Sequence, residues 1–135
     1  MQIQPYLFLD GRSDEAIEFY RRTLDAKVVM RLSFKDGPQQ PGCGADVDPN
    51  KVMHARIDIG ETTVLLSDGR CTGKPTFQGF GLSLTVRDPS EATQRFTALA
   101  DGGQVTMPLA ETFFSPSFGM LTDRFGVMWM VYVAK

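Results

Sequence analysis

The only histidine of the chain lies in a segment whose residue types could bind an anion or a carbonyl group. His54, Arg56 and Asp58 alternate with small and branched apolar residues, which predicts a strand with the three polar side chains on one face. An imidazole titrates near neutrality and a guanidinium pairs with carboxylates in two-point geometry, so His54 and Arg56 could orient such a ligand. Asp68, at the end of the next predicted strand, could complete the set. The simpler interpretations make His54 a hydrogen-bonded histidine at a strand start and Asp68 a turn residue.

A second group of side chains could line an apolar site. Met128, Met130 and Tyr132 fall on one face of a predicted C-terminal strand, and polarizable methionines suit an adaptable pocket. Phe114 and two nearby phenylalanines could form an aromatic wall beside it. A methionine-rich core is the more common explanation for such a pattern, so both interpretations remain open.

The sequence holds no readable nucleophile. Its serines stand in no strand–turn–helix nucleophile motif, and one histidine cannot serve a Ser-His-acid triad together with any second role. Cys43 and Cys71 fall in predicted loops, lack metal-ligand spacing and have no neighbouring base. We therefore expect two thiols without a catalytic role.

These side chains are positioned by a C-terminal hairpin. Residues 118–122 and 127–133 are rich in β-branched and aromatic types, and the segment 123–126 supplies turn chemistry, with Gly126 able to take a positive φ. The second strand is apolar on both faces, so both faces need a cover. A helix on one side and a pocket or partner chain on the other would provide it.

The rest of the chain predicts one βαβββ unit followed by another. In the first half we expect a strand at 3–9, a helix capped by Ser13, and strands at 27–35, 52–59 and 62–68, with a long loop at 36–50 that could act as a lid. After a linker at 69–79 we expect a strand at 80–87, a helix at 89–100 capped by Asp88 and Glu91, short strands at 104–107 and 111–115, and the hairpin. The prediction is an α+β fold: a single domain, 1–135, of two βαβββ modules at about 1–68 and 80–135, with curved mixed sheets and outer helices.

Composition excludes several classes of partner. The 135 residues are 42% hydrophobic and 22% charged with a net charge of −2, without the basic patch of a nucleic-acid binder. No apolar run approaches the length that spans a membrane, and the first residues lack the pattern of a signal peptide. We expect a cytoplasmic protein that binds neither nucleic acid nor membrane.

Several segments together resemble the PhnB-like branch of the vicinal oxygen chelate superfamily, which includes glyoxalases, bleomycin resistance proteins and extradiol dioxygenases. The resembling segments are Pro5-Tyr6-Leu7, Ala16-Ile17-Glu18-Phe19-Tyr20, His54-Ala55-Arg56-Ile57-Asp58-Ile59-Gly60, Leu65-Leu66-Ser67-Asp68, 103–113, and the hairpin with Trp129. Phe114 stands where that branch often has tryptophan, and Met128 where it often has proline. The branch also carries a demethylubiquinone methyltransferase label, but the sequence has no strand followed by a glycine-rich nucleotide loop.

The resemblance implies where a metal would be held. Superfamily enzymes use His and Glu from inner strands to hold a divalent metal that chelates vicinal oxygens. Those positions fall here on Pro5, about Leu66, Gly81 and Met130, none of which binds such a cation. We expect no metal and no cofactor.

Two functions of different classes follow. The first is a metal-free small-molecule binding protein like the superfamily's resistance proteins, with His54, Arg56, Asp68, Phe114 and Met130 as candidate ligand contacts. The alternative is a lyase, isomerase or dioxygenase with a rearranged site around His54 and Asp68. In either case we expect a homodimer, with modules paired within or between chains, because apolar side chains facing inward need a partner sheet to cover them. Those side chains are Val64, Leu66, Met128, Met130 and Tyr132.

Overall fold

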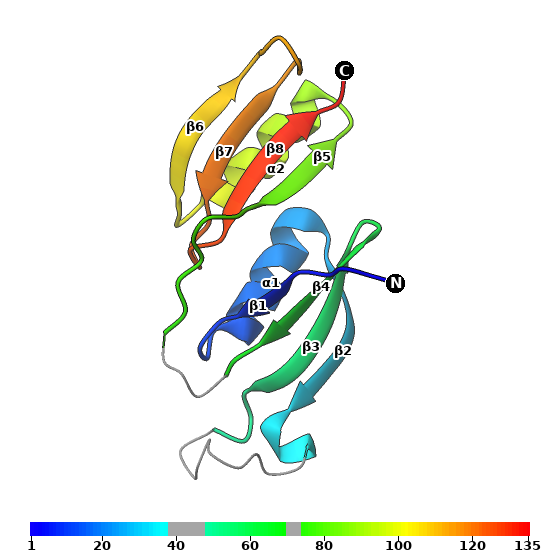
Figure 1. The fold of residues 1–135 in the computed structure, drawn as a ribbon, viewed down its shortest axis with the longest axis vertical. Helices are drawn as coiled ribbons and strands as arrows, with labels where there is room; N and C mark the ends of the chain where they lie inside the picture. Colours follow the sequence, from blue (N-terminus) through cyan, green and yellow to red (C-terminus); the bar gives the residue numbers. More distant parts are fainter. Residues whose placement is uncertain (38–47, 70–73) are drawn as a thin grey trace. The chain divides into compact units, whose positions relative to one another are not determined.

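The computed structural model describes residues 1–37, 48–69 and 74–135 and divides the chain into two compact units, Met1–Pro75 and Thr76–Lys135 (Figure 1). Most of the predicted lid loop at 36–50 lies outside the described residues, as do Cys43 and Cys71. In the described residues no helix is long and apolar enough to cross a membrane.

The first unit is a four-stranded mixed sheet with one helix. Its strand order is β1-β4-β3-β2; β1 pairs with β4 in parallel and the other neighbours are antiparallel. The elements are β1 (Tyr6–Phe8), α1 (Ser13–Leu24), β2 (Lys27–Ser33), the 3-10 helix η1 (Phe34–Asp36), β3 (Val52–Ile59) and β4 (Thr62–Ser67).

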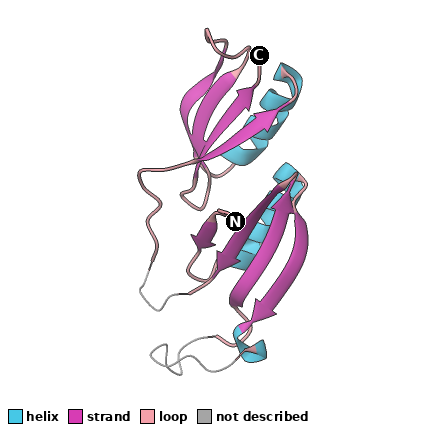
Figure 2. Cartoon of the chain, turned by 45° about the vertical axis from the view of Figure 1, so that its right-hand side comes forward, coloured by secondary structure: helices cyan, strands magenta, loops and turns pink. Residues whose placement is uncertain are grey.

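The second unit repeats this topology in the order β5-β8-β7-β6, with β5 and β8 parallel. The elements are β5 (Leu82–Val86), α2 (Pro89–Ala100), β6 (Gln104–Ala110), β7 (Phe118–Thr122) and β8 (Met128–Val133). The α+β prediction of two βαβββ modules with mixed sheets and outer helices is confirmed. Figure 2 shows each helix lying against one face of its own sheet.

The helix-covered face of each sheet is its core. In the first unit Ala16 and Tyr20 of α1 are fully buried, as are Ala55 and Ile57 of β3. In the second unit α2 buries Ala92, Phe96 and Leu99, and Gly119 of β7 allows the close approach, since a Cβ there would come within 2.8 Å of the Phe96 ring. We call the opposite face of each sheet its open face; side chains reach it at alternate positions along each strand.

Two of the side chains predicted to face inward, away from the helix, do not. Val64 pairs with Ile57 and Leu66 with Ala55, so both lie on the helix-covered face of the first sheet, and they are 3% and 0% exposed. The prediction failed because β4 was read without its pairing register, and a shift of one residue moves a side chain to the other face. Met128, Met130 and Tyr132 do lie on the open face, where they are half-buried.

The start of α1 depends on a carboxylate from a distant strand end. The helix begins at Ser13, with Arg12 at the N-cap position and no side-chain cap from it. Instead, Asp68 Oδ1 accepts from the Ser13 backbone N–H at 2.7 Å, and Asp68 Oδ2 accepts from the Val52 N–H at 2.8 Å. The prediction of Ser13 as N-cap is therefore wrong, because a residue 55 positions away supplies the acceptor that a local cap would give.

The second helix is capped locally, as its sequence indicates. Asp88 accepts from the Glu91 N–H at 2.8 Å and Pro89 occupies the first helical position. Glu91 reaches back one residue further than a capping box requires, since its Oε1 accepts from the Arg87 N–H at 3.3 Å.

The C-terminal hairpin turns around a second buried carboxylate. Asp123 Oδ1 accepts from the N–H groups of Phe125 and Val127 at 2.9 and 3.0 Å, and Oδ2 accepts from Trp129 Nε1 at 2.9 Å. Gly126 has a φ of 91°, a value that side chains disfavour. The predicted turn is confirmed, and the aspartate also fixes the indole of the following strand.

Several predicted strand bounds are wrong. The first strand begins at Tyr6 rather than residue 3, and β2 ends at Ser33, because Asp36 accepts from the Ser33 N–H and hydroxyl at 3.0 and 2.8 Å and turns the chain into η1. Residues 111–115 form no strand. There β6 continues to Ala110, and Thr112 then donates its N–H to the Ser115 carbonyl at 2.8 Å, which closes a turn.

We expect replacement of Asp68 by asparagine to destabilise the first unit. An amide has one oxygen, so the N–H of Ser13 or of Val52 loses its acceptor in a buried setting, at a cost of about 2 kcal/mol in the free energy of unfolding. Asp10→Asn is the matched control, because Asp10 is exposed and its φ of 47° is one that asparagine tolerates. Urea unfolding followed by far-UV circular dichroism measures both. Equal stability of the two variants would contradict the role given to Asp68.

Candidate ligand-binding faces

The open face of the first sheet carries a row of four side chains, one from each strand. In register, Tyr6 lies beside Leu65, Leu65 beside Arg56 and Arg56 beside Met30. All four are at least partly exposed. The row therefore joins an aromatic ring, a guanidinium and two apolar side chains on one surface.

His54 is joined to this face by a hydrogen bond with Tyr6. The Tyr6 hydroxyl oxygen lies 2.7 Å from His54 Nδ1, and the two ring centroids are 5.5 Å apart. Phe8 stacks on Tyr6 with centroids 4.8 Å apart and an interplanar angle of 19°. The contact brings the first and third strands of the unit together across β4.

The Tyr6 hydroxyl keeps its proton at neutral pH. Burial raises the pKa of the Tyr6 phenol above its usual value, and a hydrogen bond with Ser67 opposes the rise. A protonated phenol can donate to Nδ1, and in that arrangement the proton of a neutral ring lies on Nε2. The second ring nitrogen is then a hydrogen-bond donor.

Arg56 is held loosely on the same face. Its Nε lies 3.9 Å from Asp58 Oδ1, beyond hydrogen-bond distance, while Thr63 donates to that same oxygen at 2.9 Å. By contrast, Arg31 on β2 is fixed by Asp14 of α1 through two bonds of 2.7 and 2.8 Å, and those bonds hold the pKa of Asp14 below its usual value. Of these two arginines, only Arg56 keeps its donors available for a ligand.

The predicted site residues do not all come together. His54 and Arg56 share the open face of the first sheet, but Asp68 is buried and both of its oxygens accept backbone N–H groups of the same unit. Phe114 and Met130 belong to the second unit. Within the first unit, Asp68 therefore lies apart from His54 and Arg56.

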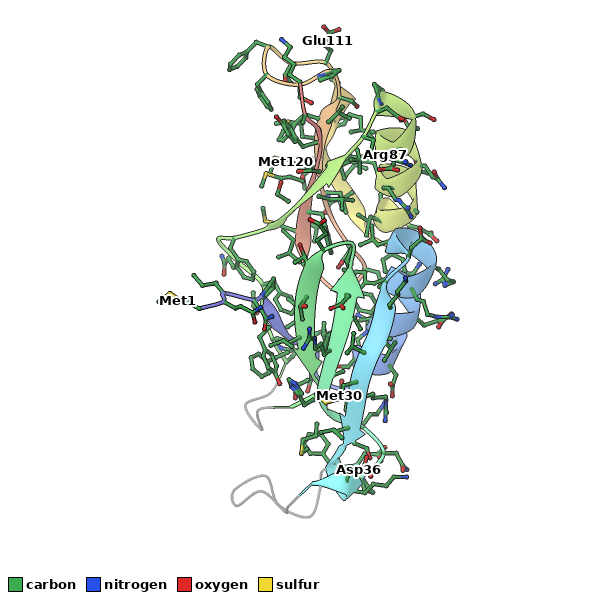
Figure 3. All side chains as sticks on the ribbon, turned by 90° about the vertical axis from the view of Figure 1, so that its right-hand side faces the viewer. Met1, Met30, Asp36, Arg87, Glu111 and Met120 are labelled. Atoms are coloured by element: carbon green, nitrogen blue, oxygen red, sulfur yellow. The ribbon has the colours of Figure 1, made fainter. Side chains whose placement is uncertain are left out.

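The open face of the second sheet carries a row of methionines. In register, Ser83 lies beside Met130, Met130 beside Met120 and Met120 beside Met107, and Met128 occupies the next open-face position on β8. Figure 3 shows Met120 on the side of the sheet opposite α2. Met107 is 46% exposed and the others are half-buried. Thioethers therefore form much of this surface.

An aromatic group lies at the end of that face. Phe114 stacks on Tyr132 with centroids 6.2 Å apart and an interplanar angle of 20°, and it meets Phe118 edge-on at 5.1 Å. Phe113 meets Phe114 edge-on at 5.2 Å and is 90% exposed. Met130 and Phe114 are therefore part of one apolar surface that Tyr132 connects.

In the described ranges, no three His, Cys, Asp or Glu side chains are arranged to hold a metal ion. One of the four positions inferred from the resemblance needs correction, since Leu66 lies under α1 and the open-face residues of β4 beside it are Leu65 and Ser67. Neither an aliphatic side chain nor a hydroxyl is a usual ligand for a divalent transition metal. The corrected register therefore offers no better donor set.

Sequence reasoning missed Tyr6, Met107 of β6 and Met120 of β7. Tyr6 lies in a segment quoted only for its resemblance, and its contact with His54 spans 48 positions. Met107 and Met120 lie side by side only through the pairing of β6 with β7, and the register of that pairing shifts on both sides of Met107. Strand pairing was the missing information in both cases, although the period-two pattern around Met120 was a usable signal.

Comparison with known proteins finds a family model and a relative that match almost the whole chain. A family model described as 3-demethylubiquinone-9 3-methyltransferase matches residues 1–132. Protein YjdN of Escherichia coli (strain K12) is 34% identical over 142 residues, covering 100% of this chain and 97% of YjdN.

Several solved structures are similar to this chain over nearly its whole length. Protein PA1353 from Pseudomonas aeruginosa has a TM-score of 0.86 and 39% identity, covering 99% of this chain and 98% of that one. A PhnB protein from Bacillus cereus, described as a 3-demethylubiquinone-9 3-methyltransferase, has a TM-score of 0.82 and 27% identity over 99% and 100% of the two chains. A glyoxylase/bleomycin resistance protein/dioxygenase domain from Frankia sp. EAN1pec shares the fold, with a TM-score of 0.70 and 17% identity over 100% of this chain and 98% of that one.

Because the chain has a single histidine, the Tyr6–His54 bond can be tested by nuclear magnetic resonance without assignment ambiguity. We expect the neutral ring to show a protonated Nε2 and an unprotonated Nδ1. Tyr6→Phe removes the donor to Nδ1 and shifts the ring toward a mixture of tautomers, whereas Tyr132→Phe, a change in the second unit, leaves it unaltered. A wild-type ring with its proton on Nδ1 would contradict the assignment.

Proposed function

The chain belongs to the family described as 3-demethylubiquinone-9 3-methyltransferase, a PhnB-like group with the glyoxalase-like fold, and we propose that it is a metal-free, cytoplasmic small-molecule binding protein. On this proposal the two modules act as one glyoxalase-like domain, and the ligand contacts the open faces of its sheets. The exact ligand is not specified by the fold, because proteins that share a fold differ in their sites.

The observation that carries the proposal is the half-exposed methionine row of the second sheet. Met107, Met120 and Met130 cross three neighbouring strands, and Tyr132 leads from them to Phe114. Covering such a surface contributes about 25 cal/mol for each Å² of apolar area removed from water. Unbranched thioethers also adapt to the shape of the molecule that covers them. An apolar or amphipathic ligand with a planar part fits this surface.

The donor set supports a metal-free site. The described residues bring together no three side chains of the usual ligand types, and the open-face positions of β4 and β8 are occupied by Leu65, Ser67 and Met130. The catalytic alternative around His54 and Asp68 is weaker than binding, because backbone N–H groups already occupy the Asp68 carboxylate. A catalytic base and its partner must both reach the substrate, and the Asp68 carboxylate is directed at backbone N–H groups instead.

Methyl transfer, the activity in the family's description, forms no part of the proposal. Dinucleotide-type sites are formed at the carboxyl ends of parallel strands by a glycine-rich turn that opens a helix. Each sheet here has one parallel pair, and α1 and α2 are preceded by β1 and β5, whose following turns contain Asp10-Gly11-Arg12 and Arg87-Asp88 rather than such a loop.

The binding proposal predicts that the neutral fluorescent probe N-phenyl-1-naphthylamine binds saturably to the folded protein. A lysine at Met120 places a charge in the centre of the methionine row, so Met120→Lys is expected to weaken binding at least tenfold, which corresponds to about 1.4 kcal/mol. Gln94→Lys adds the same charge on the exposed side of α2 and serves as the matched control. Fluorescence titration measures all three proteins.

The proposal that the site is metal-free is tested separately, by the metal content of the purified protein. Protein purified without chelator is expected to contain far less than one zinc, nickel, iron or manganese ion per chain by elemental analysis, and chelator treatment is expected to leave probe affinity unchanged. A tightly held ion near one per chain would overturn the metal-free proposal. Equal probe affinity of Met120→Lys and the wild type would overturn the assignment of the binding face.

We also propose that the protein is a two-fold homodimer, with modules paired within one chain or exchanged between two. The support is the half-exposed apolar area of the open faces, which a second copy would remove from water. Exchange costs little because the same contacts form in either arrangement.

For the dimer, sedimentation at micromolar concentration is expected to give a species of twice the 15.0 kDa chain mass. Met130→Lys, at the centre of β8, is expected to shift the protein toward monomer by at least tenfold in the dissociation constant, whereas Gln94→Lys leaves the dimer intact. A stable monomer at that concentration in the wild type would refute the dimer.

A further inference from the structure

We propose that the open face of the first sheet binds a planar aromatic carboxylate, whose carboxylate is held by Arg56 and His54 and whose ring packs beside Tyr6. This inference rests on the proposed small-molecule function and adds a second, chemically different subsite to it. The observations that carry it are the hydrogen bond at Tyr6, the loosely paired guanidinium and the charge balance around them.

The first step is that Arg56 has spare donors. Its nearest carboxylate oxygen is 3.9 Å away on Asp58, and no described residue accepts a hydrogen bond from its guanidinium. The side chain is 46% exposed. A guanidinium presents five N–H donors in a planar fork that matches a carboxylate, so an incoming carboxylate would gain two hydrogen bonds without displacing an existing one.

The second step is that His54 presents one more donor beside that fork. With the Tyr6 hydroxyl donating to Nδ1, a neutral ring carries its proton on Nε2. His54 and Arg56 are two positions apart on β3, on the same face, which places their Cα atoms about 7 Å apart. Two long side chains at that spacing can converge on one carboxylate. Tyr6 therefore acts as a positioning residue, because it fixes which nitrogen faces the ligand.

The third step is that the surroundings are aromatic and flat. Tyr6 and Phe8 already stack at an interplanar angle of 19°, and Tyr6 remains 37% exposed. Leu65 separates Tyr6 from Arg56 in the row across the sheet and gives an apolar floor between ring and charge. Stacking against an exposed aromatic ring adds a favourable contact beyond the area covered. A planar ring attached to a carboxylate matches this order of groups.

The charge balance selects a single negative charge over a phosphate. Asp58 lies on the same strand face, accepts from Thr63 and stays near Arg56, and its cross-strand partner Lys27 adds a second cation to the face. The other titratable side chains of the face are those of Tyr6 and His54. Two cations beside one carboxylate leave an excess of one positive charge, which matches a single negative charge. A dianion would be repelled by Asp58, whereas a monoanion gains the Arg56 pair.

The test follows the ring signals of the single histidine while 2-naphthoate is added at pH 7.5. We expect saturable shifts, at least tenfold weaker binding of the uncharged 2-naphthamide and of the non-planar decahydro-2-naphthoate, and no saturable shift with inorganic phosphate. Arg56→Gln is expected to weaken 2-naphthoate binding at least tenfold. Arg21→Gln removes an arginine on α1 that pairs with Glu18 and is expected to have no effect.

Other results overturn the inference. Equal binding of 2-naphthamide, or an unchanged affinity in Arg56→Gln, would show that charge recognition is absent. Equal binding of decahydro-2-naphthoate or of phosphate would show a general anion surface without aromatic selection, and no binding of 2-naphthoate at millimolar concentration would remove the subsite. If N-phenyl-1-naphthylamine still binds through Met120, the proposed function stands without this subsite.

Discussion

The structure depends on buried carboxylates that accept backbone N–H groups. Asp68 ties the end of β4 to the start of α1 and to the start of β3, and Asp123 holds the β7–β8 turn together with the Trp129 indole. A buried N–H without an acceptor costs about 1–3 kcal/mol, so each carboxylate secures several elements at once. In the first unit this bond replaces a local helix cap. It therefore sets where α1 begins.

Once the helices are fixed, the open faces are fixed as well, and there the two units differ. On the two central strands, the first sheet pairs Leu65 with Arg56 on its open face, whereas the second pairs Met130 with Met120. Strand order and pairing direction are the same in both units. The difference therefore resides in side chains alone, and it gives one polar, aromatic surface and one thioether surface on a repeated framework.

Period and turn chemistry predicted most of the fold. The bounds of β3, α2 and β7 agree with the sequence expectation to the residue, because alternation, an Asp-Pro cap and a flanking turn mark them locally. The failures share one cause. The local sequence predicts Ser13 as a cap and Leu66 as inward-facing, because the partners that decide these points, Asp68 and Ala55, lie outside the local segment.

In the candidate site, too, the local sequence predicts some features, whereas others depend on strand pairing between distant segments. His54 and Arg56 were found because alternation places them together on one strand, whereas Tyr6 was not, since only parallel pairing of β1 with β4 brings it within reach. Yet Tyr6 gives the histidine a defined role. An isolated imidazole exchanges between two tautomers, and a phenol that donates to Nδ1 selects one of them. A residue that is unremarkable in the sequence thus makes a 2.7 Å contact with the only histidine, and Arg56, with its nearest carboxylate oxygen 3.9 Å away, lies two positions further along the same strand face.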